Sequence, residues 1–325
     1  MNSIVVGGGI SGVACATALA EAGLDVTVRD RGRVLGGRMM SRTLRGTGTA
    51  FDGRVVDIGA SYFTASEPLF LAEVNELINR GVVRPWTDAF HVAGPSGIEA
   101  VSSGPMRYAA PLGLRSVVAG MADHAPSVVV ELDSPVSAVE VDGTDVRVDG
   151  EPVRTAGVCM PRPQAARILD LEDVPAIPWE PVLAVTCVFP RSQWIDLDGV
   201  FVNDDPVLTW IADDGSRRGD GAPVLVAHVH PVLSVRHLDD PNTVLPSVVA
   251  TIQRVLSISD LPDWAQVHRW SLAKPLAGHD EPFWRHPTGR LGLAGDEWHG
   301  GPRVEAAWLS GRSLGTALAA AALSE

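Results

Sequence analysis

The stretch IVVGGGISG at residues 4–12 constrains the fold more than any other part of this sequence. Its apolar run predicts a buried strand, and the small side chains of residues 11–22 predict a helix directly after it. In such a strand–turn–helix unit, Gly7 permits the tight turn, Gly9 lets a phosphate approach the backbone, and Gly12 lets helix and strand pack closely. The spacing therefore predicts a dinucleotide-binding site.

An acidic residue supports this interpretation. The run DVTVRD predicts a second strand, and Asp30 ends it about 20 residues after the glycines, where a carboxylate can bind a ribose hydroxyl. We also expect cofactor contacts from Ile10 and Ser11 at the helix N-terminus and from the neighbouring Arg31. A carboxylate at this place opposes a 2′-phosphate, so NADP is disfavoured while NAD and FAD stay open. The alternative is a tight turn in an unrelated α/β protein.

A second pair of glycines distinguishes between those two ligands. In GRVLGGRMMSR, at residues 32–42, Gly36, Gly37 and Arg38 predict a second phosphate site made of backbone and guanidinium groups. A simple NAD dehydrogenase does not need such a site, whereas FAD extended across the sheet does. The alternative is an arginine-containing surface loop.

The C-terminal part repeats the pattern of strand, glycine turn and helix. In LGLAGDEWHGGPRVEAAWLSGRSL, at residues 291–314, Gly295 and Asp296 follow a predicted strand. Asp296 could bind a ribityl hydroxyl, and the helix that begins near Arg303 and Val304 would direct its dipole at the pyrimidine end of a flavin. As an alternative, Asp296 is an ordinary helix cap. The three glycine motifs together predict an FAD site.

Composition excludes other classes of ligand. The 325 residues carry a formal net charge of −13, which argues against nucleic acid or an anionic membrane as a partner. Cys15, Cys159 and Cys187 have neither metal-ligand spacing nor a motif for flavin attachment, so we expect reduced thiols, no metal and noncovalent FAD. The apolar segments near both ends are interrupted by glycines or too short to cross a bilayer, so we expect a cytoplasmic protein.

The predicted elements form a βαβ start, a strand-rich middle and a βα finish. That order predicts an α/β fold, in which a strand-rich α+β substrate domain is inserted into a Rossmann-type FAD-binding domain. We assign residues 1–65, 106–165 and 285–325 to the FAD-binding domain, and residues 66–105 and 166–284 to the substrate domain.

Several motifs resemble those of the FAD-containing amine-oxidase superfamily. They are GGGISG, the distal GGR, VDIGASYF and the terminal GD…GGPRVEAAWLSG. The internal stretches LTWIADDGSRRG, LVAHVHPVLSVRHL and HRWSLAKP are more specifically similar to the renalase branch, including its short bacterial members. Leu233 departs from an expected tryptophan, and Arg217 and Arg218 stand near an expected Lys-Pro. These departures leave the substrate more open than the fold or the cofactor.

The resemblance implies further site residues. Gly59, Ala60, Ser61 and Tyr62 would pass beside the flavin ring, and Val136 would contact the adenine end through its backbone.

The same resemblance supplies catalytic candidates. His228 matches a histidine of the renalase pattern, and His230 would share its strand face by the period of two. Trp270 would stack near the flavin, and His299 follows in the loop after Asp296. We take His228, Trp270, Tyr62 and His299 as catalytic candidates, with a purely structural role as the alternative for each.

The resemblance implies an oxidase that passes hydride from 2- or 6-dihydro-NAD(P) isomers to FAD and then to O2, giving hydrogen peroxide. Such a transfer needs no strong base, which agrees with the lack of an obvious acid–base dyad in the sequence. Two alternatives stay open: an amine or other small-molecule oxidase of the same fold, and an FAD-binding protein without turnover. Lys274, the single lysine, does not match the placement expected of an amine oxidase.

Overall fold

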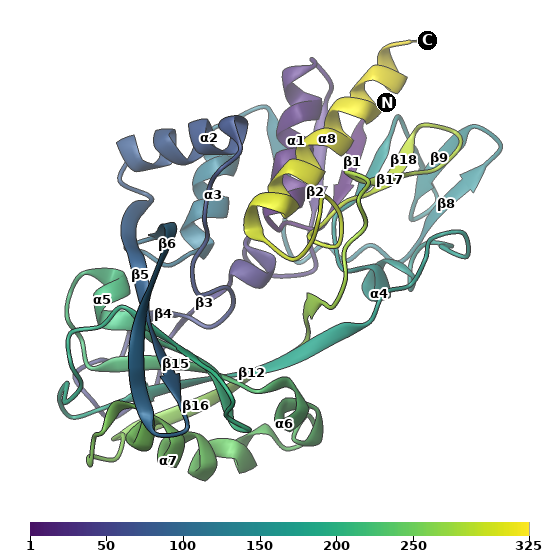
Figure 1. Cartoon of the computed structure of the whole chain (residues 1–325). Helices are drawn as coiled ribbons and strands as arrows, with labels where there is room; N and C mark the ends of the chain where they lie inside the picture. The colour runs from purple at the N-terminus through teal and green to yellow at the C-terminus, as the bar shows by residue number, and fades with distance from the viewer. Residues whose placement is uncertain (325) are drawn as a thin grey trace.

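Two sheets dominate the computed structural model, which describes residues 1–324 (Figure 1). The first sheet has the strand order β17-β18-β11-β1-β2-β7. Its strands are β1 (Ser3–Val6), β2 (Val26–Arg29), β7 (Val128–Glu131), β11 (Ala156–Val158), β17 (Trp284–Arg285) and β18 (Leu291–Leu293). All neighbours pair in parallel except β17 with β18. The predicted α/β class with a Rossmann-like domain is confirmed.

Helices α1 (Ile10–Glu21) and α8 (Val304–Leu323) pack against each other beside this sheet (Figure 1). They approach closely because α8 carries glycine at the contact. A Cβ atom on Gly311 would lie 2.0 Å from the carbonyl oxygen of Ser11. Within residues 1–324, no helix has both the length and the apolar character needed to cross a membrane.

A small antiparallel sheet covers part of the first one. It consists of β8 (Val139–Asp142), β9 (Asp145–Val148) and β10 (Glu151–Val153). Val139 and Val148 belong to the same buried cluster as Ile4 and Val158 of the first sheet, so the two sheets share a core.

The second large sheet has seven strands in the order β16-β12-β15-β14-β13-β5-β6. They are β5 (Arg84–Gly94), β6 (Gly97–Ala109), β12 (Trp179–Val188), β13 (Gly199–Val202), β14 (Leu208–Asp213), β15 (Val224–Val229) and β16 (Trp264–Pro275). Helix α7 (Leu245–Leu256) covers one face, where Val248 and Ile252 join a core cluster with Leu183 and Ala227. Successive side chains of a strand point to opposite faces of the sheet. The face away from α7 therefore carries a second set of side chains, which can pack against other segments.

The remaining elements connect these layers. They are β3 (Ser41–Thr43), β4 (Val55–Asp57), α2 (Pro68–Asn79), α3 (Arg115–Asp123), α4 (Arg162–Ala165), α5 (Asp214–Arg218), α6 (Pro231–Arg236) and the 3₁₀ turns Gly37–Met39 and Pro241–Val244.

The structure bears on two sequence predictions, the position of His230 and the domain boundaries. The prediction that His230 shares a strand face with His228 is wrong, because β15 ends at Val229 and the His230 side chain caps α6 by accepting from the Val232 N–H at 3.3 Å. The predicted domain boundaries at 106 and 285 fall within β6 and β17, and the division itself stays a prediction.

We expect Gly311→Ala to lower the free energy of unfolding by about 1–3 kcal/mol, because the added methyl group forces α8 away from α1. Denaturant unfolding of the two proteins measures the change. Thr316→Ala, on the exposed side of the same helix, is the control and should stay within about 0.5 kcal/mol of wild type. Equal stability of the Gly311 variant would show that the two helices are not in tight contact.

Candidate functional site

The first two glycine motifs meet in space. The Gly36 N–H donates to the Gly8 carbonyl at 2.9 Å, and a Cβ on Gly37 would lie 3.3 Å from the Gly9 Cα. Gly12 has a purely steric function, since its Cβ would lie 1.8 Å from the Gly7 carbonyl oxygen. Gly9 differs, because its own Cβ would have no neighbour closer than 4.0 Å. The backbone around Gly9 is therefore accessible to a ligand.

Asp30 holds this loop in place. Its carboxylate accepts the Gly8 N–H at 2.5 Å and the Gly32 N–H at 2.6 Å. The Asp30 carbonyl also accepts from Ser134 at 2.9 Å, which brings the loop that carries the half-buried Val136 alongside. Arg31 is exposed.

Arg38 and Asp296, predicted from opposite ends of the chain, form a two-pronged ion pair. The Nη1 and Nη2 atoms of Arg38 lie 2.7 and 2.6 Å from the two carboxylate oxygens. The guanidinium also donates to the Ala273 carbonyl at 3.2 Å and lies over the Trp179 ring at 5.1 Å. The structure thus joins the second glycine motif to the third.

The N-terminus of α8 lies in the same region. Gly295 donates its N–H to the Ser310 hydroxyl at 3.1 Å, and a Cβ on Gly295 would meet no atom within 4 Å. Arg303 is exposed, and Val304 is the first residue of the helix. His299 adopts a left-handed backbone with φ 60°, and its N–H donates to the Glu281 carbonyl at 3.0 Å.

The segment from Ile58 to Tyr62 lies between the Arg38 loop and the seven-stranded sheet. Ala60 donates to the Arg38 carbonyl at 2.9 Å. Gly59 approaches so closely that a Cβ would lie 2.0 Å from the same oxygen, which only glycine permits.

The sheet face toward this segment carries two of the catalytic candidates. The Trp270 indole N–H donates to the Ile58 carbonyl at 2.7 Å. His228 lies near the Gly59 backbone and is the register partner of Trp210. Burial lowers the pKa of His228 to about 4, with the positive charges of Arg217 and Lys274 adding to the effect. His228 is therefore a neutral imidazole near pH 7.

Tyr62 lies farther along the same face. Its ring packs 5.1 Å from Phe90 and 5.7 Å from Trp210. Arg107 completes the group, with its guanidinium 4.4 Å from the centre of the Phe90 ring. The structure therefore brings His228, Trp270 and Tyr62 to one face of the sheet, and it leaves His299 in a separate loop. The aromatic group around Phe90 was not anticipated, since no motif joins its members.

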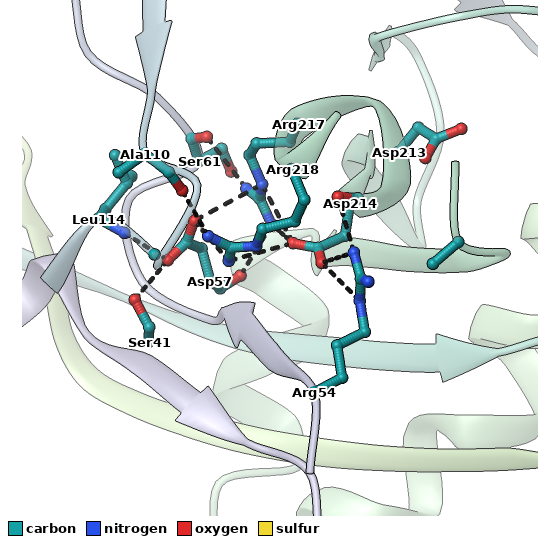
Figure 2. A network of polar contacts seen from close by, with 12 residues as sticks. Ser41, Arg54, Asp57, Ser61, Ala110, Leu114, Asp213, Asp214, Arg217 and Arg218 are labelled. Atoms are coloured by element: carbon teal, nitrogen blue, oxygen red, sulfur yellow. Dashed lines mark hydrogen bonds and ion pairs between the residues drawn. The ribbon is translucent and has the colours of Figure 1, made fainter. Parts of the chain in front are cut away.

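A buried ion network contacts the backbone of Asp57 and Ser61, beside and within the Ile58–Tyr62 segment (Figure 2). Arg217 is fully buried and donates to the Asp57 carbonyl at 3.2 Å, the Ser61 carbonyl at 3.0 Å and the Asp214 carboxylate at 2.7 Å. Arg218 lies 2.9 Å from the Asp57 carboxylate. The arginines that depart from the family pattern thus determine the path of the predicted flavin-side segment.

Two more connections complete the network. Arg54 pairs with Asp214 at 3.0 Å and with Asp220. Burial acts to raise the pKa of Asp214, but the guanidinium groups of Arg217, Arg218 and Arg54 outweigh it and hold that pKa below its ordinary value. The Asp214 carboxylate is therefore ionised at neutral pH.

Glu297, next to the Arg38–Asp296 pair, is a buried carboxyl that the sequence interpretation did not include. One oxygen accepts the Arg162 N–H at 3.1 Å, while the other has no partner. Burial, followed by the negative charge of Asp296, raises the pKa of Glu297 to about 7. The sequence signal for it is the bulky loop DEWHGGP, in which two acidic residues stand side by side.

These residues fit a bound dinucleotide. The hydroxyls of Ser11 and Ser61 are buried without a hydrogen-bond partner, and a Cβ on Gly9 or Gly295 would have no protein neighbour closer than 4.0 Å. A phosphate or flavin edge would satisfy such groups. Over the described range, no three His, Cys, Asp or Glu side chains are arranged to bind a metal.

Comparison with known families agrees with this geometry. Residues 5–77 match the model of an NAD(P)-binding Rossmann-like domain, and residues 98–317 match that of flavin containing amine oxidoreductase. The second match covers the sheet face and the C-terminal glycine motif.

Solved structures share the fold across the whole chain. A putative protoporphyrinogen oxidase from Exiguobacterium sp. 255-15 is 14% identical with a TM-score of 0.76, and the alignment covers 98% of each chain. A double mutant of putrescine oxidase is 16% identical with a TM-score of 0.72, and the wild-type enzyme bound to putrescine is also 16% identical with a TM-score of 0.69. Both alignments cover 100% of this chain and 99% of the oxidase.

We expect Glu297→Gln to flatten the dependence of stability on pH. In the wild type the raised pKa means that the folded state holds a proton that the unfolded state releases, so stability falls as pH rises from about 4.5 to about 7. A shift of this size corresponds to about 3 kcal/mol. The unfolding free energies of wild type and variant should therefore be similar near pH 4.5, and above pH 7 the variant should be the more stable protein.

The control is Glu281→Gln, which changes an exposed carboxyl nearby and should leave the wild-type pH profile intact. A Glu297→Gln profile that declines as steeply as that of wild type would contradict the assignment.

Proposed function

The chain belongs to the flavin-containing amine oxidoreductase family, and on that premise we propose that it binds FAD noncovalently and oxidises dihydro-NAD(P) isomers as a renalase-like oxidase. The two glycine loops, Asp30 and the α8 N-terminus would hold the dinucleotide part of FAD. Arg38 and Asp296 would be redistributed from their mutual ion pair to phosphate and ribityl contacts. The flavin, when bound, accepts a hydride and passes the electrons to O2, which gives hydrogen peroxide.

The environment of His228 is the observation that carries this proposal. The imidazole is neutral, and the two cations that act on it are paired, Arg217 with Asp214 at 2.7 Å and Lys274 with Glu180 at 2.8 Å. Carboxylates that are already paired leave little negative charge to bind a protonated amine, whereas an uncharged dihydropyridine ring needs none. Hydride loss from a dihydropyridine also needs no base, because the nitrogen lone pair supplies the electrons and the ring becomes aromatic.

The residues of this chain then have mainly positioning roles. Trp270 is fixed by its bond to Ile58 and offers a flat apolar wall to a nicotinamide ring. Gly59–Ser61 separates that wall from the Arg38 loop, and the ion network of Asp57, Asp214 and Arg217 keeps this segment from shifting. Rigid placement of donor over acceptor is the main requirement for such a transfer.

Gly295→Ala is expected to weaken FAD binding at least about tenfold, or 1.4 kcal/mol, while leaving the apoprotein equally stable. The reason is that the new methyl group meets no protein atom within 4 Å and so projects into the space that the cofactor would use. Titration of the apoproteins with FAD measures the affinity, and denaturant unfolding is the control. Unchanged affinity would exclude cofactor contact at Gly295.

The substrate proposal is tested by mixing the oxidised holoprotein anaerobically with 2- and 6-dihydro-NAD(P) isomers, ordinary NADH and a set of amines. We expect rapid bleaching of flavin absorbance by an isomer, slow bleaching by NADH and none by amines. Bleaching by an amine would instead establish the amine oxidase alternative. A flavin that no compound reduces would favour the protein without turnover.

A further inference from the structure

Arg107 is a buried cation without a counterion. Its side chain belongs to a residue that is 6% exposed, and its Nη1 atom is buried without a hydrogen-bond partner. Its guanidinium stacks on the Phe90 ring, and no carboxylate in the part of the chain that the structure describes forms an ion pair with it. Arginine is almost never buried unless it is paired, so an anion is the expected partner.

The neighbours of Arg107 offer the same kind of polar atom. The indole Nε1 of Trp210 is also buried without an acceptor, and the hydroxyl of the half-buried Tyr62 forms no hydrogen bond within residues 1–324. Phe90 holds the three together, with Trp210 at 4.7 Å, Tyr62 at 5.1 Å and the guanidinium at 4.4 Å. Guanidinium and indole groups can only donate, so an acceptor from outside the chain, such as a bound anion, would satisfy them.

The cluster is continuous with the proposed site of oxidation. Trp210 in β14 is the register partner of His228 in β15, so both side chains lie on the same face of the sheet. Phe90 lies on β5, three strands away from β15 in the sheet order. At about 4.8 Å for each strand spacing, the backbones of β15 and β5 are about 14 Å apart. A substrate that reacts beside His228 must therefore be elongated to reach Arg107.

We propose that Arg107, with Trp210 and Tyr62, binds an anionic group of the substrate, a phosphate or a carboxylate, at the end of the sheet face away from the reacting ring. The inference rests on the proposed oxidation at His228 and adds the charge and length of the substrate. In dihydro-NAD(P) the anionic group is the diphosphate or the 2′-phosphate. A flat aromatic carboxylate is the other source of the same chemistry.

The test is Arg107→Met, which keeps an unbranched apolar side chain over Phe90 and removes the charge. Inorganic diphosphate and benzoate are titrated into holoprotein by calorimetry, so binding is read without turnover. We expect one of them to bind wild type and to bind the variant about 10- to 100-fold more weakly. Tighter binding of diphosphate identifies phosphate recognition, and tighter binding of benzoate identifies a carboxylate. Arg236→Met, at an exposed position of α6, is the control for net charge.

Kinetics with the best substrate from the reduction panel provide the second readout. Arg107→Met should raise KM with little change in kcat, because the anion is bound equally before and during hydride transfer. Removal of an unpaired buried charge should leave the variant at least as stable as wild type. Anions that bind wild type and Arg107→Met equally, or that bind neither, would overturn this inference. Anion binding at Arg107 in a protein that oxidises no isomer would overturn the proposed function alone.

Discussion

The buried guanidinium of Arg217 links the seven-stranded sheet to the segment Ile58–Tyr62. Arg217 lies on α5, the short helix after β14, and its guanidinium donates to the Asp214 carboxylate on that helix and to the backbone carbonyls of Asp57 and Ser61. The segment Ile58–Tyr62 has no regular secondary structure and lies between the Arg38 turn and the large sheet. A buried charge tolerates little displacement, since loss of one partner leaves another charge unpaired. The position of the predicted flavin-side backbone therefore depends on an electrostatic connection in addition to the apolar packing of Ile58.

Much of the cofactor region was predictable because each of its pieces is local. Glycine spacing, Asp30 and the C-terminal Gly-Asp pair are signals within short stretches, and their backbone consequences follow directly. The contact between Arg38 and Asp296 was not predictable, because both were assigned to a ligand and nothing in the sequence states that they meet. The role of Arg217 was also not predictable, because a departure from a family pattern does not show which residues the new side chain contacts.

The face of the large sheet shows a different limit. His228, Trp270 and Tyr62 could be named from the resemblance, but their common face depends on the pairing of β12, β14, β15 and β16. The strands β5 and β6 carry Phe90 and Arg107. Their polar and apolar residues do not alternate strictly and their pairing has several register irregularities, so the sequence pattern did not predict which side chains share a face. Their importance is tertiary, because an arginine becomes informative only when burial removes its water and no carboxylate replaces it.

The order of strands in the first sheet has a consequence for how the protein is made. Strand β1 hydrogen-bonds to β11, and β11 to β18, so the start, middle and end of the chain are neighbours in one sheet. During synthesis, the sheet that contains β1 can therefore be completed only after β11 and β18 have been made. Long-range parallel pairing of this kind is slow and leaves strand edges exposed in the meantime. Because Gly295, Asp296 and helix α8 follow the other strands of this sheet in the sequence, a nascent chain would acquire the complete predicted cofactor site only after they too have left the ribosome.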